Sequence, residues 1–376
     1  MKKIITDVVN FPNVCETVRF TACFVSMLMR AEGITDKNCE FFCDSQKGSC
    51  VRCGKCADLV PLNKKHCELY NLYTAVTGFG FLQIDLSNDT HMRADWNQTC
   101  NVLLREFDWY IGFTMDYAGY DYEELIFALD EKEQVFAKIK TSVDNDIPVL
   151  ALFGEIYQWV LITGYDDTGA LYGFDGSQGY WGKPFSQPEG YDENGVFYMP
   201  DWYEKKGHAF ILGEKKKPTV TLKDVFRRGI KIMESMKEKN FYGKSAEFML
   251  NDANFDSLND EELLQMRNRL SAWIGQPIDQ RAVLGWAVNP LRLGKEPSRE
   301  IIAFNEINRL CWTMHDVLWI AWRGIGEYMG GDMLTWAKGL KNKTIRRMIA
   351  DCFAFVRDND EYMLEELKKG FLEDRP

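Results

Sequence analysis

Six of the eleven cysteines lie within residues 39–67, and their spacing is the clearest sign of chemistry in the chain. Cys50 and Cys53 are two residues apart and are followed by Gly54, a spacing in which two thiolates can bind one metal ion while the glycine lets the backbone turn. A tetrahedral site needs two further ligands. The sequence predicts a metal site formed by Cys43, Cys50, Cys53 and Cys56.

Other ligand sets and other chemistry stay open for this segment. Cys39, Cys67 or His66 could replace one of the four ligands. Structural Zn²⁺ is the predicted cofactor because it suits four thiolates, and a 4Fe–4S cluster is the alternative. A disulfide-bonded loop conflicts with a reducing compartment, and six unligated thiols this close together would be liable to oxidation. The polar residues between the cysteines have little hydrophobic content for folding, so metal binding would supply that free energy.

Cys23 is a second candidate, in this case for a nucleophile. A nucleophilic cysteine must ionise, and the unpaired N–H groups at a helix N-terminus favour the thiolate. The apolar run at residues 23–29 predicts a buried helix, and Thr21 as its N-cap would place Cys23 in the first turn. Buried cysteines without a catalytic role are common on such helices, so this placement alone leaves both interpretations open.

A series of short apolar segments and turns follows further along the chain. Pro148 and Val149 begin one segment, Gln158-Trp159-Val160 begins the next, and Gly164-Tyr165-Asp166-Asp167 leads to a segment that ends at Asp175. This order resembles the papain-like cysteine peptidases of the bacteriocin-processing type. With Asp201-Trp202 and Gly213-Glu214-Lys215 ahead of a helical domain, it is also similar to the N-terminal domain of the butirosin-biosynthesis acyltransferase family of bacteria. The resemblance covers about residues 12–218.

The resemblance implies roles for three residues. Cys23 matches the nucleophile at the head of the first helix, and Asp175 matches the residue that orients the catalytic histidine. Gln158 stands where the family has that histidine, and an amide cannot take the proton of the thiol. Thr17 and Val18 stand where the family places a glutamine that donates to the oxyanion.

These departures leave three interpretations. The domain could be a catalytically inactive ligand-binding or scaffold protein in which Cys23, Gln158 and Asp175 form a hydrogen-bonded remnant. Cys23 could accept an acyl group from an activated thioester, a reaction that demands less of a base than amide hydrolysis. His91 or His208 could supply the base from another element.

The first expectation is a cysteine-dependent acyltransferase or amidohydrolase. Its partners would be a small-molecule or peptide substrate and an acyl carrier. General proteolysis is not expected, because an unassisted thiol with a pKa of about 8.5 is only a few per cent ionised at pH 7.

An acidic and aromatic segment offers a further interpretation. It contains Asp116, Asp121, Glu123 and Glu124 with Tyr117, Tyr120 and Tyr122. A solvated loop and helix start, with acids in the first turn, explains it. The functional alternative is recognition of a cationic amine. His315 and the tryptophans around it, in contrast, are predicted to lie in a helical core.

The elements that must position these residues change in type along the chain. Helices are predicted at residues 23–29 and 122–139, and strands at 149–153, 159–163, 170–174, 196–199 and 209–212. After Pro218 the pattern is helical, with helices predicted at 222–239, 260–273, 298–329 and 344–372 and Thr221 as the first N-cap. The prediction is a papain-like α+β domain over residues 1–218, carrying the Cys-rich insertion at about 39–67, and an all-α domain over 219–376.

Charge and hydropathy narrow the classes of partner. Residues 219–376 carry 24 basic and 24 acidic side chains, so the entire formal charge of −11 falls on residues 1–218. This acidity argues against nucleic acid as a partner. No apolar run approaches the roughly 20 residues that span a bilayer, and Asp7 interrupts the apolar start of the chain. We therefore expect no membrane contact and a cytoplasmic location.

Overall fold

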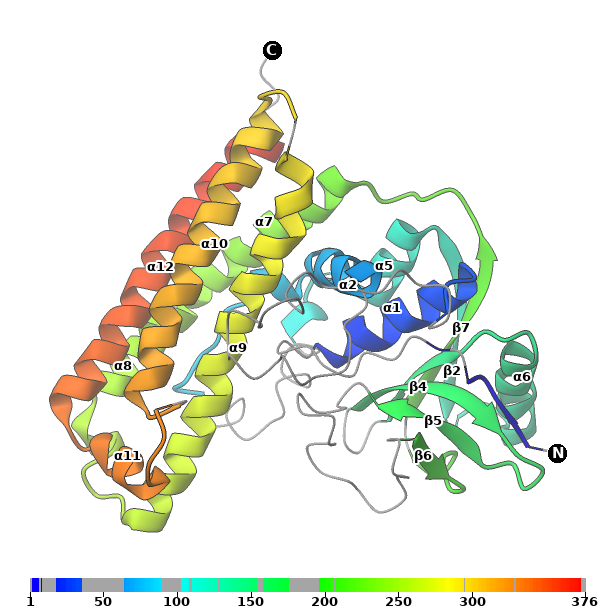
Figure 1. Ribbon diagram of the computed structural model, residues 1–376, viewed down its shortest axis with the longest axis horizontal. Helices are drawn as coiled ribbons and strands as arrows, with labels where there is room; N and C mark the ends of the chain where they lie inside the picture. The colour runs from blue at the N-terminus through cyan, green and yellow to red at the C-terminus, as the bar shows by residue number, and fades with distance from the viewer. Residues whose placement is uncertain are drawn as a thin grey trace. The chain divides into compact units, whose positions relative to one another are not determined.

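The protein has an α+β structure in which helices accompany one antiparallel sheet (Figure 1). The computed structural model describes residues 2–6, 8, 18–35, 64–88, 103–107, 110–127, 129–153, 158–175, 196–205, 207–293, 295–327 and 329–372. The chain forms two compact units. Unit 1 consists of Met1–Tyr73 and Ile111–Thr219, and unit 2 consists of Thr74–Tyr110 and Val220–Pro376.

Unit 1 is built on the sheet. Its strands are β1 (Lys3–Ile4), β2 (Tyr120–Phe127), β3 (Val149–Phe153), β4 (Gln158–Tyr165), β5 (Leu171–Asp175), β6 (Val196–Met199) and β7 (Gly207–Lys215). The strand order is β2-β7-β3-β4-β5-β6, and β1 pairs with β4. All five residues of β3 are buried, which fits a central strand covered on both faces.

Helices cover the two faces of this sheet. On one face, the ring of Phe20 in α1 (Arg19–Ala31) packs against Trp159, with ring centroids 4.9 Å apart. On the other face, ring contacts lead from α6 (Lys132–Asp144) to the sheet through Phe136, Trp202, Phe127 and Phe153. Trp159 pairs with Leu152, the neighbour of Phe153 in β3. Because successive strand residues point to opposite faces, α1 and α6 lie on opposite sides of the sheet.

Two helices carry the chain between the units. They are α2 (Lys64–Thr77) and α5 (Tyr110–Ala118). Within unit 1, Tyr73 of α2 packs against Phe24 of α1 and Tyr117 of α5, with ring centroids 5.1 and 5.8 Å apart. The Tyr70 hydroxyl accepts a hydrogen bond of 2.9 Å from the backbone N–H of Val18. These contacts hold the start of α1 in place.

The regular secondary structure in the described residues of unit 2 is helical. Its helices are α7 (Leu222–Lys239), α8 (Phe241–Leu250), α9 (Asp260–Arg292), α10 (Arg299–Gly324), α11 (Met333–Gly339) and α12 (Lys343–Phe371), with 3-10 turns at Phe79–Phe81 and Asp252–Asn254. Figure 1 shows α9, α10 and α12 as long helices lying side by side. No described helix is long and apolar enough to cross a membrane.

Most predicted strands and helices are confirmed, and one helix is wrong. Residues 122–139 form strand β2 and then helix α6 rather than one helix. Among the described strands, β2 lies at the edge of the sheet beside β7, so many of its polar side chains remain exposed and the alternation of apolar and polar residues is weak. α9 also continues to Arg292, through Pro277.

The second unit also takes in a segment from the first half of the chain. The predicted boundary at residues 218/219 assigned Thr74–Tyr110 to the first domain, whereas these residues group with the helices of unit 2. The contacts explain this grouping. Arg281 donates to the carbonyl oxygen of Gly80 at 2.8 Å, and Ser245 Oγ accepts from the N–H of Leu86 at 2.9 Å.

Candidate functional site

The start of α1 differs from the prediction. The N-cap is Val18, and Thr21 is the third residue of the helix, so the prediction of Thr21 as N-cap is wrong. The carbonyl of Val18 already accepts from the N–H of Ala22 at 3.1 Å. Cys23 is the fifth helical residue and lies beyond the first four N–H groups that lack an intrahelical partner. The helix N-terminus therefore supports a thiolate at Cys23 less than the sequence suggested.

Cys23 is buried where α1 meets strand β4. The side chain is 4% exposed, and Sγ donates to the carbonyl oxygen of Trp159 over 3.8 Å. Trp159 directly follows Gln158 in β4. On the neighbouring strand β5, Asp175 is the backbone partner of Val160. The structure thus brings the Cys23 thiol to the strand that carries Gln158, beside the strand that ends at Asp175. Only the backbones of Gln158 and Asp175 are described, so the positions of their side chains stay open.

Trp159 is the residue at this contact that the sequence analysis did not single out. Its indole is fully buried between Phe20 of α1 and Phe210 of β7, with ring centroids 4.9 and 5.8 Å away. The indole Nε1–H has no hydrogen-bond partner among the described residues. In the sequence, Trp159 was marked only as part of the motif Gln158-Trp159-Val160, and that motif assigns a role to Gln158 and none to Trp159.

His208, one of the two histidines considered as a substitute base, lies on β7. Its Nδ1 is 2.7 Å from Oε1 of Glu124, and its backbone pairs with Leu152 of β3. Leu152 also pairs with Trp159, so His208 and Trp159 are two strands apart, about 10 Å between backbones. His208 is therefore paired with Glu124 and lies two strands from Trp159, the residue that accepts the hydrogen bond of Cys23. His91 lies outside the described residues.

The acidic and aromatic segment is paired with cations of the chain itself. Lys216 Nζ lies 2.9 Å from Asp116 and 2.8 Å from Asp121, and these hydrogen bonds raise the pKa of the Lys216 ammonium. Glu123 pairs with Lys138, and Glu124 pairs with His208. The segment is the end of α5 and the strand β2 rather than a helix start. Recognition of a cationic amine stays a prediction, in which the amine would compete with these side chains.

The predicted metal ligands Cys43, Cys50, Cys53 and Cys56 lie outside the described residues. Elsewhere, in the part of the chain that the structure describes, no group of three or more His, Cys, Asp or Glu side chains is arranged to hold a metal ion. Structural Zn²⁺ and the 4Fe–4S alternative therefore stay predictions.

Unit 2 contains a buried polar cluster that the sequence analysis missed. Arg281 Nη2 lies 2.6 Å from Oδ2 of Asp360, and Gln83 donates to the same oxygen at 3.0 Å. Burial raises the pKa of the Asp360 carboxyl, and the Arg281 guanidinium opposes that shift. Asp360 lies on an amphipathic helix with many exposed acids, so nothing in the local sequence marked it as buried.

His315 is a core residue, as predicted. It is 6% exposed, its Nδ1 lies 2.8 Å from Asp316, and its Nε2 accepts from Trp319 at 2.9 Å. The Trp319 ring in turn packs against Trp322, with centroids 4.9 Å apart. These contacts explain the tryptophans near His315 in α10 as packing residues.

Comparison of the chain with protein-family models, curated proteins and solved structures finds no match. The α+β architecture is therefore established by the structure alone. A papain-like assignment of unit 1 rests on the sequence motif.

Proposed function

We propose that unit 1 is a papain-like domain in which Cys23 accepts an acyl group from an activated thioester and transfers it to an amine of a small molecule or peptide. The observation that supports this most directly is the 3.8 Å contact between Cys23 Sγ and the carbonyl oxygen of Trp159. It joins the candidate nucleophile to the strand that carries Gln158. A helix packed on an antiparallel sheet with a cysteine at that junction fits the predicted architecture.

The proposed reaction exchanges bonds at one carbonyl carbon. In the first step, the Cys23 thiolate attacks the thioester, the new C–S bond forms, and the donor sulfur leaves as a thiolate. In the second step, the amine attacks the acyl-cysteine, a C–N bond forms, Cys23 leaves as a thiolate, and the amine proton passes to solvent. Neither leaving group is an amine that must be protonated, so the reaction does not require a histidine at position 158.

The hydrogen bond to Trp159 defines what must change before the first step. A carbonyl oxygen accepts only from the protonated thiol, so the ionised sulfur would have to turn away from Trp159. Cys23 is also 4% exposed, so the donor reaches the sulfur only if α1 or its covering residues move. The proposal therefore predicts that acylation accelerates with donors that bind unit 1 tightly.

Two measurements test the proposal on the full chain. The first is the rate at which a thiol-reactive probe labels each cysteine at pH 7, mapped by peptide mass spectrometry. Cys311 and Cys352 serve as internal controls, because burial raises the pKa of Cys311 to about 12 and that of Cys352 to about 11. Cys23 should react at least about tenfold faster than either control, since both remain almost fully protonated.

The second measurement is transfer of an acyl group from an acyl-pantetheine thioester, read as a mass increase of the intact protein. The wild type and Cys352→Ser should each gain one acyl group, and Cys23→Ser should gain none at the thioester level. Labelling of Cys23 no faster than that of Cys311, together with no acyl adduct, would overturn the proposal.

One observation favours a second candidate, a catalytically inactive ligand-binding or scaffold protein. The β4 residue next to Gln158 whose side chain packs on α1 is Trp159, and its indole cannot accept a proton and is fully buried. In that case Cys23 contributes packing only, and the same labelling experiment would show it to be as slow as Cys311.

A further inference from the structure

We propose that the outward faces of α10 and α12 form a self-association surface, through which two copies of this chain pair with their α12 helices antiparallel about a two-fold axis. The surface lies within unit 2 and is independent of the function proposed for unit 1. Its evidence comes from an apolar groove, a repeat of exposed apolar side chains and the charges along α12.

The groove lies between α10 and α12. Its volume is about 580 Å³, and its apolar lining consists of Val317 from α10 and Met348, Cys352 and Phe355 from α12. The two helices lie close together beside it, because the Met348 methyl group occupies the space in which a Cβ at Gly324 of α10 would lie. An open apolar groove between two long helices suits a further helix as its occupant.

Exposed apolar side chains continue from this groove along α12. Met348, Phe355 and Tyr362 recur every seven residues, the spacing that keeps one side of a helix against a partner helix. Phe355 and Tyr362 are 40% and 46% exposed, and Ile320, about one turn after Val317 on α10, is 51% exposed. A contiguous row of large exposed apolar side chains indicates an interaction surface.

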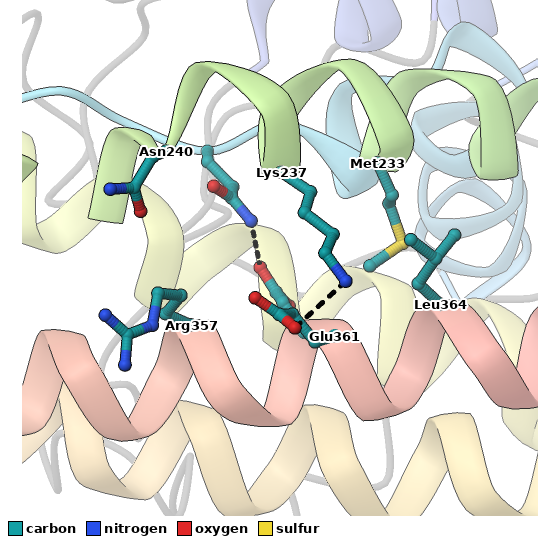
Figure 2. Close-up of a pocket in the computed structure, with 8 residues that line it drawn as sticks. Met233, Lys237, Asn240, Arg357, Glu361 and Leu364 are labelled. Atoms are coloured by element: carbon teal, nitrogen blue, oxygen red, sulfur yellow. Dashed lines mark hydrogen bonds and ion pairs between the residues drawn. The ribbon is translucent and has the colours of Figure 1, made fainter. Parts of the chain in front are cut away.

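The side of α12 that faces α7 differs from this row, because ion pairs within the chain cover it. Lys237 of α7 lies 3.0 Å from Glu361, and Figure 2 shows the two side chains joined between the helices. Lys368 pairs in the same way with Glu234 of α7 at 3.1 Å. The outward row therefore remains the side of α12 that is open to a second copy.

Opposite charges lie toward the two ends of the apolar row. Arg347, next to Met348, is exposed and has no ion pair among the described residues. Glu365, three residues after Tyr362, is also exposed, and it pairs with Lys368 of the same helix at 3.3 Å. Arg347 and Glu365 are 18 residues apart, which is five helical turns, so they project from the same side of α12.

A two-fold axis beside Phe355 makes use of both the apolar row and these charges. With the two α12 helices antiparallel, each Phe355 meets the partner's Phe355, and each Met348 meets the partner's Tyr362. Arg347 then comes opposite the partner's Glu365, and the symmetry forms this ion pair twice. A parallel arrangement would instead bring Arg347 next to the partner's Arg347, which like-charge repulsion disfavours.

The face is large enough for a weak specific interface. α12 has 29 residues and is therefore about 43 Å long and about 10 Å wide, so with the adjoining part of α10 it offers about 600 Å² on each copy. The total of about 1,200 Å² lies at the lower end of specific protein interfaces. Residues 219–376 have no net charge, so electrostatic repulsion between these regions does not oppose the contact. We expect a dimer in exchange with the monomer.

Sedimentation equilibrium of the full chain over a range of concentrations tests the proposal. A reductant and a chelator are present, so that the Cys-rich segment cannot link two chains. The mass should rise from 43.6 kDa toward twice that value. Phe355→Glu should raise the dissociation constant at least about tenfold, because it places two like charges at the centre of the interface. Leu250→Glu, a change at a residue of α8 that is 50% exposed, is the control and should leave the association unchanged.

Reversal of the charges tests the antiparallel arrangement, and it does not depend on the folding of Phe355→Glu. Arg347→Glu and Glu365→Arg should each weaken the dimer about three- to tenfold, and the double variant should restore it, because the exchanged charges again meet across the two-fold axis. A chain that stays monomeric at every concentration would overturn the proposal. A dimer that Phe355→Glu leaves intact, or a double variant no tighter than the single ones, would overturn it as well.

Discussion

Arg281 and Asp360 form an ion pair that is nearly inaccessible to solvent. The side chains are 0% and 2% exposed, and each makes further hydrogen bonds, Arg281 to the carbonyl of Gly80 and Asp360 to the amide of Gln83. Such a pair adds little net stability relative to apolar side chains of the same size, because both charges lose their hydration. Removing one partner is different, since the other charge is left buried and unpaired.

The variant Arg281→Met should therefore lower the free energy of unfolding by about 3–5 kcal/mol, measured by urea denaturation. The double variant Arg281→Met with Asp360→Leu should recover part of that loss, because no buried charge remains. Arg309→Met, which breaks the exposed pair with Glu306, is the control and should change stability by less than about 1 kcal/mol. A similar, small loss at Arg281 and Arg309 would contradict the buried-pair interpretation.

At the scale of elements, two threonines predicted as N-caps had opposite outcomes. Thr221 caps α7, and it does so within a capping box: its side chain accepts from the N–H of Asp224, whose carboxylate accepts from the N–H of Thr221. Thr21 has Phe24 at the equivalent position three residues later, so no reciprocal bond can form. The residue three positions after the threonine, Asp224 in one case and Phe24 in the other, therefore distinguished the real helix start more than the threonine itself did.

The capping box predicts a pH-dependent contribution from Asp224. Hydrogen bonds from the side chain and backbone of Thr221 lower the pKa of the Asp224 carboxyl below its unfolded value of about 3.9. The stabilisation is then fully present above pH 3.9 and is lost as the pH falls through the lower folded pKa. Asp224→Asn should cost up to about 1 kcal/mol at pH 7 and progressively less below pH 4, measured by urea denaturation across that range.

Lys231→Ala, an exposed change in the same helix, provides the comparison for that series. Its effect on stability should not fade in the acid range as that of Asp224→Asn does. A cost of Asp224→Asn that stayed constant from pH 7 to pH 3 would show that the carboxylate charge does not contribute.

At the scale of the whole molecule, unit 2 is assembled from two separate parts of the chain. Three buried side chains from the C-terminal helices donate to backbone carbonyls of residues 76–80. Arg228 donates to Thr77 at 2.7 Å, Gln280 to Phe79 at 2.7 Å, and Arg281 to Gly80 at 2.8 Å. A fragment that lacks these carbonyls leaves two guanidinium groups and an amide unsatisfied in its core.

A fragment of residues 219–376, which matches the domain predicted from sequence, should therefore lack a cooperative thermal transition when followed by circular dichroism. The full chain, measured under the same conditions, should retain one from unit 2. The contrary result would be a fragment that melts as sharply and at the same temperature as unit 2 in the full chain, and it would show that residues 74–110 are dispensable for that fold.

Local patterns in the sequence determined the strands β3 to β7, the helical character of residues 219–376 and the N-cap at Thr221. Periodicity and capping act over a few residues, so they can be read directly from the chain. β2 was predicted as part of a helix because an edge strand with exposed acids shows little alternation of apolar and polar residues. Its pairing with β7, about 90 residues later in the chain, is what makes it a strand.

The tertiary structure alone decided which distant residues meet. Cys23 was predictable as a buried helical residue, but its contact with Trp159 spans 136 residues. Arg281 and Asp360 are 79 residues apart, and Gln83 and Asp360 are 277 apart. Such pairings depend on how whole elements pack, and side-chain type and spacing along the chain do not encode them. The same physical reason explains why residues 74–110 belong to unit 2 although their composition does not set them apart from their neighbours.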